Sequence, residues 1–172
     1  PSIVEITEKE KSIIKNAKKY SMTTEIRMWS LINSLKKIVN EKIDGDIVEC
    51  GIWRGGNIIL INKILEEQKI HKKIYCYDTF EGMDIADNVD KELSSGQSAS
   101  KMIESDDYYK CKSSLDDTKK IISQNVEDTK DIIFIKGKVE DTLMVKKNLP
   151  KKICVCRLDT DYYSSTKIEL EI

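Results

Sequence analysis

Two hydrophobic patterns alternate along this chain. Near the N-terminus, apolar residues recur every three or four positions over residues 7–19 and again after Thr24, which predicts two amphipathic helices. The spacing Thr7-x-x-Glu10 is a capping-box pattern at the start of the first helix. Four short apolar runs farther along predict strands, and the stretches between and after them predict helices. The predicted strands cover 46–50, 73–77, 131–135 and 153–158, and the predicted helices 56–67, 113–125, 139–147 and 163–172.

This alternation of strand and helix predicts an α/β fold with a parallel sheet and right-handed crossovers. We expect an N-terminal helical segment over residues 1–44 and a doubly wound, Rossmann-like domain over 45–172. Ligands of such sheets bind beyond the carboxyl ends of the strands. Residues 83–112 are polar and irregular, and a connection of this length usually holds small helices or covers a functional site.

The last predicted strand has an unusual setting. Residues 153–158 are apolar on both faces, which is typical of an interior parallel strand. No further strand follows before Ile172, so this run would be an exposed edge. We therefore expect a fragment of a longer protein, or a half that another chain completes, with little or no activity alone.

Composition narrows the classes of function. The 172 residues suffice for one domain with a core, and a net charge of −1 gives no argument for nucleic acid or an anionic membrane as partner. No apolar run approaches the roughly 20 residues of a membrane span. His71 is the only histidine and lies among lysines, which leaves little room for a Ser-His-Asp triad or a multi-histidine metal site.

Cysteine usage indicates a reducing compartment. The chain has five cysteines, an odd number, and four of them fall in predicted strands: Cys50, Cys76, Cys154 and Cys156. We interpret them as buried free thiols of a cytoplasmic protein. The spacing Cys154-x-Cys156 does not match that of structural zinc sites.

A glycine-containing turn follows the first predicted strand. Its sequence is Glu49-Cys-Gly-Ile-Trp-Arg-Gly-Gly56, and a helix begins directly after it, as in nucleotide-binding corners of α/β domains. The acidic residue at the start of this turn, Glu49, distinguishes a dinucleotide from a cationic cofactor. A dinucleotide site presents backbone N–H groups and a helix N-terminus to a pyrophosphate, which a carboxylate would repel. Glu49 instead suits a cationic ligand, such as the ammonium and sulfonium groups of S-adenosylmethionine.

Further acids fall at or near the ends of the later strands. Asp78 could accept both hydroxyls of a ribose, or it could cap a turn. Glu140 or the neighbouring backbone could meet an adenine, or this acid could complement a helix N-terminus. Asp159 and Asp161 could hold Mg²⁺, which prefers oxygen ligands, although two acids alone do not identify a metal site.

Taken together, these motifs resemble one family. The chain resembles the macrocin O-methyltransferase family, whose members are S-adenosylmethionine- and Mg²⁺-dependent sugar O-methyltransferases. The matching pieces are Met22-Thr-Thr-x-x-Arg27, Gly45-Asp-Ile-Val-Glu-Cys-Gly-Ile-Trp-Arg-Gly-Gly56, Tyr77-Asp-Thr-Phe-Glu-Gly-Met83, Lys136-Gly-Lys-Val-Glu-Asp-Thr142 and Arg157-Leu-Asp-Thr-Asp-Tyr-Tyr-Ser-Ser-Thr166.

The resemblance implies a Rossmann-like methyltransferase fold, with a partial parallel sheet of strand order 3-2-1-4 behind N-terminal helices. It implies that Asp159 binds Mg²⁺ and acts as general base, that Asp161 is a second metal ligand, and that Thr24 and Arg27 lie near the cofactor or the substrate entrance. The residues implied to bind S-adenosylmethionine are Glu49, Gly51, Trp53, Gly55, Asp78, Thr79, Phe80, Gly137, Val139 and Glu140.

The acceptor implied by the resemblance is a small glycosylated metabolite. The family pattern also has three further strands and a metal-binding Asp-Asp pair beyond the point that corresponds to Ile172. Two other functions stay open: a non-catalytic nucleotide-binding or assembly module of the same fold, and a Rossmann-type oxidoreductase or epimerase. The second would need phosphate-cradling glycines without a leading acid. The oligomeric state is open, a homo-oligomer included.

Overall fold

A four-stranded parallel sheet forms the centre of the computed structural model, which describes residues 5–83, 86–106 and 110–171. The strand order is β3-β2-β1-β4, as predicted. The strands are β1 (Asp46–Cys50), β2 (Ile74–Asp78), β3 (Ile132–Lys136) and β4 (Ile153–Leu158). The helices are α1 (Glu8–Ala17), α2 (Glu25–Asn40), α3 (Gly56–Gln68), α4 (Ala99–Ser105), α5 (Leu115–Ser123), α6 (Val139–Thr142) and α7 (Tyr163–Glu171), with short 3₁₀ turns η1 (Lys18–Tyr20) and η3 (Lys146–Asn148).

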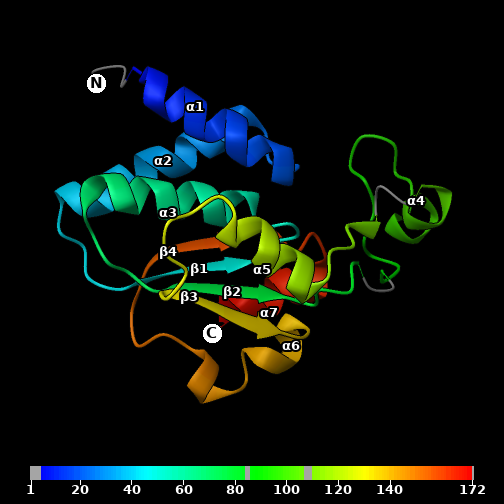
Figure 1. Cartoon of the computed structure of the whole chain (residues 1–172). Coiled ribbons are helices and arrows are strands. Elements are labelled where there is room, and N and C mark those ends of the chain that lie inside the picture. Colours follow the sequence, from blue (N-terminus) through cyan, green and yellow to red (C-terminus); the bar gives the residue numbers. More distant parts are fainter. Residues whose placement is uncertain (1–4, 84–85, 107–109, 172) are drawn as a thin grey trace.

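Helices cover both faces of the sheet (Figure 1). On one face, α1, α2 and α3 are stacked, and Ile122 of α5 joins the same core. On the other face, α6 and α7 pack over a smaller core that contains Tyr75 and Tyr77 of β2. The alternation of side chains along each strand explains the division, since Ile74 and Cys76 belong to the first core.

The N-terminal helices form where capping residues start them. Thr7 and Glu10 form the predicted capping box of α1, and the Thr24 side chain accepts a hydrogen bond from the backbone N–H of Arg27 at the start of α2. Both helices pack directly on α3. Met28 of α2 is fully buried in the core, and Trp29 is half-buried against it.

Two predictions about β4 and its surroundings need correction. The helix predicted over 139–147 ends at Thr142, and only a 3₁₀ turn follows. Four buried strand cysteines were expected, but Cys156 is exposed and Cys154 half-buried. The reason is the position of β4, because an edge strand leaves its side chains partly open to solvent, including Ile153, which is 49% exposed.

The long connection after β2 carries a small helix, as expected. It contains α4 and an isolated antiparallel bridge between Lys91 and Ser98, and it extends away from the sheet (Figure 1). Residues 84–85 and 107–109 of this predicted lid lie outside the described residues. Among the helices described, none combines the length and apolarity that a membrane crossing requires.

Candidate functional site

A cavity of about 550 Å³ lies where the carboxyl ends of the strands meet the N-terminal helices. Its walls come from the segment before α2, the turn after β1, the loops after β2, β3 and β4, and the start of α7. The residues discussed below that line it are Ser21, Thr23, Gly51, Trp53, Asn57, Asp78, Thr79, Gly137, Val139, Glu140, Asp159, Asp161 and Ser165.

The turn after β1 has a backbone that few residues tolerate. Gly51 has φ +80°, and a Cβ atom there would lie 2.2 Å from the carbonyl oxygen of Asp159. Trp53 also has a positive φ, +48°. A Cβ at Gly56 would lie 2.5 Å from the carbonyl oxygen of Ala17. The turn therefore contacts the loop after β4 on one side and the N-terminal helices on the other.

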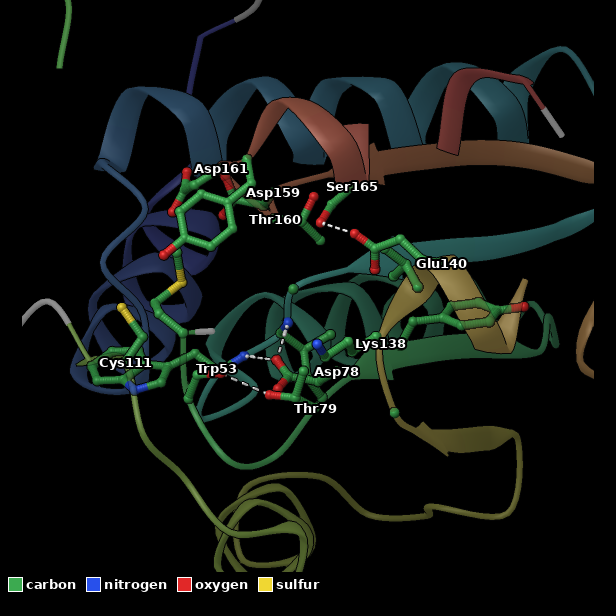
Figure 2. Close-up of a pocket in the computed structure, with 18 of the residues that line it drawn as sticks. Trp53, Asp78, Thr79, Cys111, Lys138, Glu140, Asp159, Thr160, Asp161 and Ser165 are labelled. Atoms are coloured by element: carbon green, nitrogen blue, oxygen red, sulfur yellow. Dashed lines mark hydrogen bonds between the residues drawn. The ribbon is translucent and has the colours of Figure 1, made fainter. Parts of the chain in front are cut away.

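Asp78 connects this turn to the end of β2. Its Oδ2 accepts hydrogen bonds from the backbone N–H groups of Ile52 at 2.8 Å and Trp53 at 2.9 Å (Figure 2). Its Oδ1 accepts one from the backbone N–H of Phe80 at 2.8 Å. Burial raises the pKa of the Asp78 carboxyl, against these three backbone donors, which act to lower it. The carboxylate therefore caps the turn, and because three of its roughly four acceptor positions are taken by the backbone, one position is left for a ribose hydroxyl rather than the two that were predicted.

Acidic side chains outnumber basic ones around the cavity. Among the described lining residues, Lys138 is the basic side chain, and the acidic ones are Asp78, Asp87, Glu140, Asp141, Asp159 and Asp161. Asn57 adds a buried acceptor, Oδ1, that has no hydrogen-bond partner among the described residues. Such a wall favours a cationic ligand and disfavours a pyrophosphate.

Two of these acids, Asp159 and Asp161, follow β4 and lie on the same side of the cavity (Figure 2). Burial raises the pKa of the Asp161 carboxyl, and the charge of Asp159 adds to the rise. Asp161 has φ +67°, an uncommon backbone conformation for a residue other than glycine. Within the described ranges, no group of three or more His, Cys, Asp or Glu side chains is placed to hold a metal ion, so these two acids form at most part of a metal shell.

The loop after β3 forms another wall. Gly137 has φ +138°, and its backbone N–H donates to the carbonyl oxygen of Asp78 at 3.0 Å. Glu140 in α6 accepts a 2.7 Å hydrogen bond from the hydroxyl of Ser165 in α7 (Figure 2). Ser165 is buried, so this contact holds the Glu140 carboxylate at the edge of the cavity.

Behind the cavity, Glu49 forms a buried ion pair. Its Oε1 accepts a 2.7 Å hydrogen bond from Nη1 of Arg157 and a 2.9 Å bond from the Asn57 amide. The Glu49 side chain is 1% exposed and that of Arg157 17%. Burial raises the pKa of the Glu49 carboxyl above its usual value, while Arg157 and Asn57 oppose the rise.

The structure brings most of the predicted site residues together around one cavity. Thr24 and Arg27, implied to lie near the cofactor or the substrate entrance, are not among its lining residues, and neither are three of the residues implied to bind the cofactor. Glu49 is turned toward Arg157. Gly55 forms the left-handed N-cap of α3 and packs against Ile122. The Phe80 ring is in the core, with its centroid 6.3 Å from that of Phe134. These three residues shape the loops that carry the lining residues.

Sequence reasoning missed Arg157, Asn57, Thr23 and Ser165. A signal for Arg157 existed, because Glu49 and Arg157 are both charged residues that directly follow apolar runs within their strands. The two strands are neighbours, and the two residues are paired in register. Opposite charges at matching positions of adjacent buried strands indicate an ion pair. The local sequence carried no comparable signal for the three polar neutral residues.

A protein-family model described as Macrocin-O-methyltransferase (TylF) matches residues 4–172. The chain is similar to an 8-demethyl-8-(2,3-dimethoxy-alpha-L-rhamnosyl)-tetracenomycin-C 4'-O-methyltransferase of Streptomyces olivaceus, with 28% identity over 155 residues, 84% of this chain and 53% of that protein. A demethyldecarbamoylnovobiocin O-methyltransferase of Streptomyces niveus is 29% identical over 58 residues, 33% of this chain and 22% of that protein. The chain thus matches about half the length of one curated relative and about a fifth of the other.

Solved structures show the same fold. The O-methyltransferase NovP aligns with a TM-score of 0.72 and 23% identity, over 88% of this chain and 60% of that one. The calicheamicin methyltransferase CalS11 aligns with a TM-score of 0.64 and 14% identity, over 98% of this chain and 74% of that one. Because both identities are below 25%, these alignments show a shared arrangement of helices and strands and carry no argument about function.

Proposed function

The chain belongs to the macrocin O-methyltransferase family, and from that premise we propose that it is the cofactor-binding part of an O-methyltransferase that uses S-adenosylmethionine. The family implies this methyl donor. The proposed acceptor is a sugar hydroxyl of a small glycosylated metabolite, because one curated relative is named for a rhamnosyl-bearing tetracenomycin. The observation that carries the proposal is the acidic wall of the cavity beside a glycine turn, which suits a ligand with two positive groups.

The proposed binding mode uses the loops in chain order. Gly51 and Trp53, with the buried acceptor of Asn57, face the amino-acid part of the cofactor. Asp78 accepts one ribose hydroxyl in a hydrogen bond to a charged acceptor, worth about 1.5–3 kcal/mol, and the neutral hydroxyl of Thr79 accepts the other. The loop of Gly137, Val139 and Glu140 borders the adenine. Glu49, Gly55 and Phe80 support these loops from behind the cavity wall.

In the proposed reaction, Asp159 takes the proton of the acceptor hydroxyl. When bound, the cofactor would supply the methyl group of its sulfonium to the acceptor oxygen, with the thioether as the leaving group. Arg157 holds Oδ2 of Asp159 at 2.8 Å, so the carboxylate keeps Oδ1 for the hydroxyl or another ligand. Holding the reacting groups in line contributes most to such a displacement.

Magnesium is a further part of this proposal. Asp159 and Asp161 offer two carboxylates, and Mg²⁺ usually takes only one or two from a protein while water and substrate complete its shell. When bound, the ion would lower the pKa of the acceptor hydroxyl. Titration calorimetry of Mg²⁺ into the parent and an Asp161→Asn variant tests this part; equal heats and affinities would remove Asp161 from the metal site.

The free cysteines favour a cytoplasmic location for the protein that carries this chain. Cys50, Cys76, Cys154 and Cys156 are free thiols, as expected in a reducing compartment. Fractionation of the producing cells tests this assignment, and recovery outside the cytoplasm would contradict it.

Calorimetry with S-adenosylhomocysteine and with NAD tests the proposed cofactor. We expect the first ligand to bind and NAD to show no saturable heat. Asp78→Ala should weaken S-adenosylhomocysteine binding by at least about tenfold, since one lost charged hydrogen bond is worth roughly 1.5 kcal/mol or more.

Asp44→Ala is the matched control, because Asp44 is an exposed acid paired with Lys152 away from the cavity. Tight NAD binding would favour the oxidoreductase alternative. Unchanged affinity in Asp78→Ala would refute the ribose assignment.

A further inference from the structure

A buried polar network joins four parts of the chain behind the cavity. It contains Arg157 of β4, Glu49 of β1, Asn57 of α3, Thr23 before α2, and Asp159 after β4. We propose that Arg157 is a positioning residue that holds both Asp159 and the Ser21–Thr23 segment against the cavity. This inference rests on the proposed function for one measurement, the affinity for the cofactor, and is independent of it for the others.

The guanidinium of Arg157 makes three contacts from two nitrogens. Nη1 donates to Oε1 of Glu49 at 2.7 Å. Nη2 lies 2.8 Å from Oδ2 of Asp159 and donates to the hydroxyl of Thr23 at 2.9 Å. Because a guanidinium is planar and its donors have fixed directions, these contacts fix the three partners relative to one another.

Glu49 provides the fixed point of this arrangement. It lies inside β1, between β2 and β4, and is paired in register with Arg157. A charge buried in an apolar strand strongly favours a paired geometry, so Glu49 anchors one nitrogen of the guanidinium. The position of the other nitrogen, Nη2, is then fixed as well, and Nη2 holds Asp159 and Thr23 in place.

Asn57 makes a second hydrogen bond to the N-terminal segment, in addition to that of Arg157. Its Nδ2 donates both to the Thr23 hydroxyl at 3.1 Å and to Oε1 of Glu49 at 2.9 Å. Thr23 is buried, and both Ser21 and Thr23 line the cavity. The hydroxyl of Thr23 therefore connects this wall of the cavity to the sheet, and Arg157 is one of its two donors.

A simpler interpretation gives Arg157 no role beyond neutralising Glu49. The two interpretations differ for a variant that removes both charges. Removing one partner of a buried ion pair is strongly destabilising, whereas replacing both partners with neutral residues is often tolerated. Neutralisation alone predicts that the double replacement restores every property, while positioning predicts that it restores stability but not the geometry of the cavity.

The experiment compares the full chain with Arg157→Met and with the double variant Glu49→Gln, Arg157→Met. Three quantities are measured: the thermal midpoint, the affinity for S-adenosylhomocysteine, and amide hydrogen exchange of peptides that contain Ser21–Thr23. We expect the midpoint to fall in the single variant and to recover in the double variant. In the double variant we still expect about tenfold weaker binding, or more, and faster exchange at Ser21–Thr23.

Recovery of all three properties in the double variant would overturn the proposal. If the double variant does not fold, Thr23→Val decides, because it keeps the ion pair and removes the hydroxyl that Arg157 and Asn57 contact. It should show the same faster exchange and weaker binding, and parent-like values would again contradict positioning. Asp44→Asn with Lys152→Met is the control, an exposed pair whose loss should change none of the three measurements.

Failure of this inference and failure of the proposed function give different results. If the parent chain does not bind S-adenosylhomocysteine, the proposed cofactor is wrong. Hydrogen exchange at Ser21–Thr23 needs no ligand, and it still decides whether Arg157 holds that segment.

Discussion

Gly51 brings the turn after β1 into contact with the loop after β4. Its φ is +80°, and a Cβ atom at this position would lie 2.2 Å from the carbonyl oxygen of Asp159, so the position excludes any side chain. Glycine is therefore required here because two backbone segments of the cavity wall approach each other closely, and not because a phosphate must bind to the turn. Asp159, the proposed general base, depends on that approach.

Gly51→Ala should destabilise the chain more than Gly96→Ala does. Gly96 also has a positive φ, +69°, but open space surrounds the place of its Cβ. We expect about 1 kcal/mol for Gly96→Ala from the left-handed backbone alone, and about 3 kcal/mol for Gly51→Ala because the backbone must also move. Urea denaturation measures both losses of unfolding free energy. Equal losses would show that the close approach of Gly51 to the carbonyl oxygen of Asp159 adds nothing to the cost of an alanine at position 51.

At the residue scale, the sequence pointed to acids that line one cavity but not to their partners. Asp78, Glu140, Asp159 and Asp161 could be recognised because strand ends meet at one edge of a parallel sheet. The charge of Glu49, taken alone, suggests a partner for a cationic ligand. Its side chain is instead paired with Arg157, a contact between residues more than a hundred positions apart that no local pattern specifies.

At the scale of elements, every strand was predicted to within one residue. The reason is that short β-branched runs between helical stretches are distinctive, and the parallel alternation restricts how they connect. The helix after β3 was predicted too long. Leu143 is buried after the helix ends, so its apolar side chain suited either a longer helix or the turn that is observed.

The capping box of α1 allows the contribution of a single carboxylate, that of Glu10, to the stability of the fold to be tested. The Glu10 carboxylate accepts hydrogen bonds from the backbone N–H and hydroxyl of Thr7 and forms an ion pair with Lys36 of α2. Burial raises the pKa of Glu10, but the contacts with Lys36 and Thr7 outweigh it and hold the pKa below its usual 4.5. The charged form is therefore bound more tightly in the folded chain than in the unfolded one.

Glu10→Gln should lower the free energy of unfolding at pH 7 by about 1–2 kcal/mol. Because the folded pKa is below the unfolded one, the contribution of Glu10 is complete above pH 4.5 and is lost as the pH falls through the folded value. Urea denaturation of parent and variant between pH 3 and 7, with Glu8→Gln as an exposed control on the same turn, measures this. A difference that does not shrink in acid would contradict the charge-based explanation.

At the scale of the whole molecule, the cavity is built from segments that are distant in the sequence. The segment before α2, the turn after β1 and the loops after β2, β3 and β4 all contribute to it. The sheet order brings these loops together, and the resemblance to the family implied that order. The resemblance to the family implied Thr24 and Arg27 near this site, but the lining residues Ser21 and Thr23 were not predicted, since the helical pattern of the N-terminal segment does not show which of its side chains will face the sheet.

Hydrogen exchange with and without S-adenosylhomocysteine tests most directly whether this cavity is the cofactor site. The ligand should slow exchange in peptides that contain Ser21–Thr23, Gly51–Trp53, Asp78–Thr79 and Gly137–Glu140, because these segments form the walls of the cavity. Peptides of α4, which extends from the body of the fold, should exchange at the same rate in both samples. Protection that is absent from these four segments, or confined to other parts of the chain, would contradict the assignment of the cofactor to this cavity.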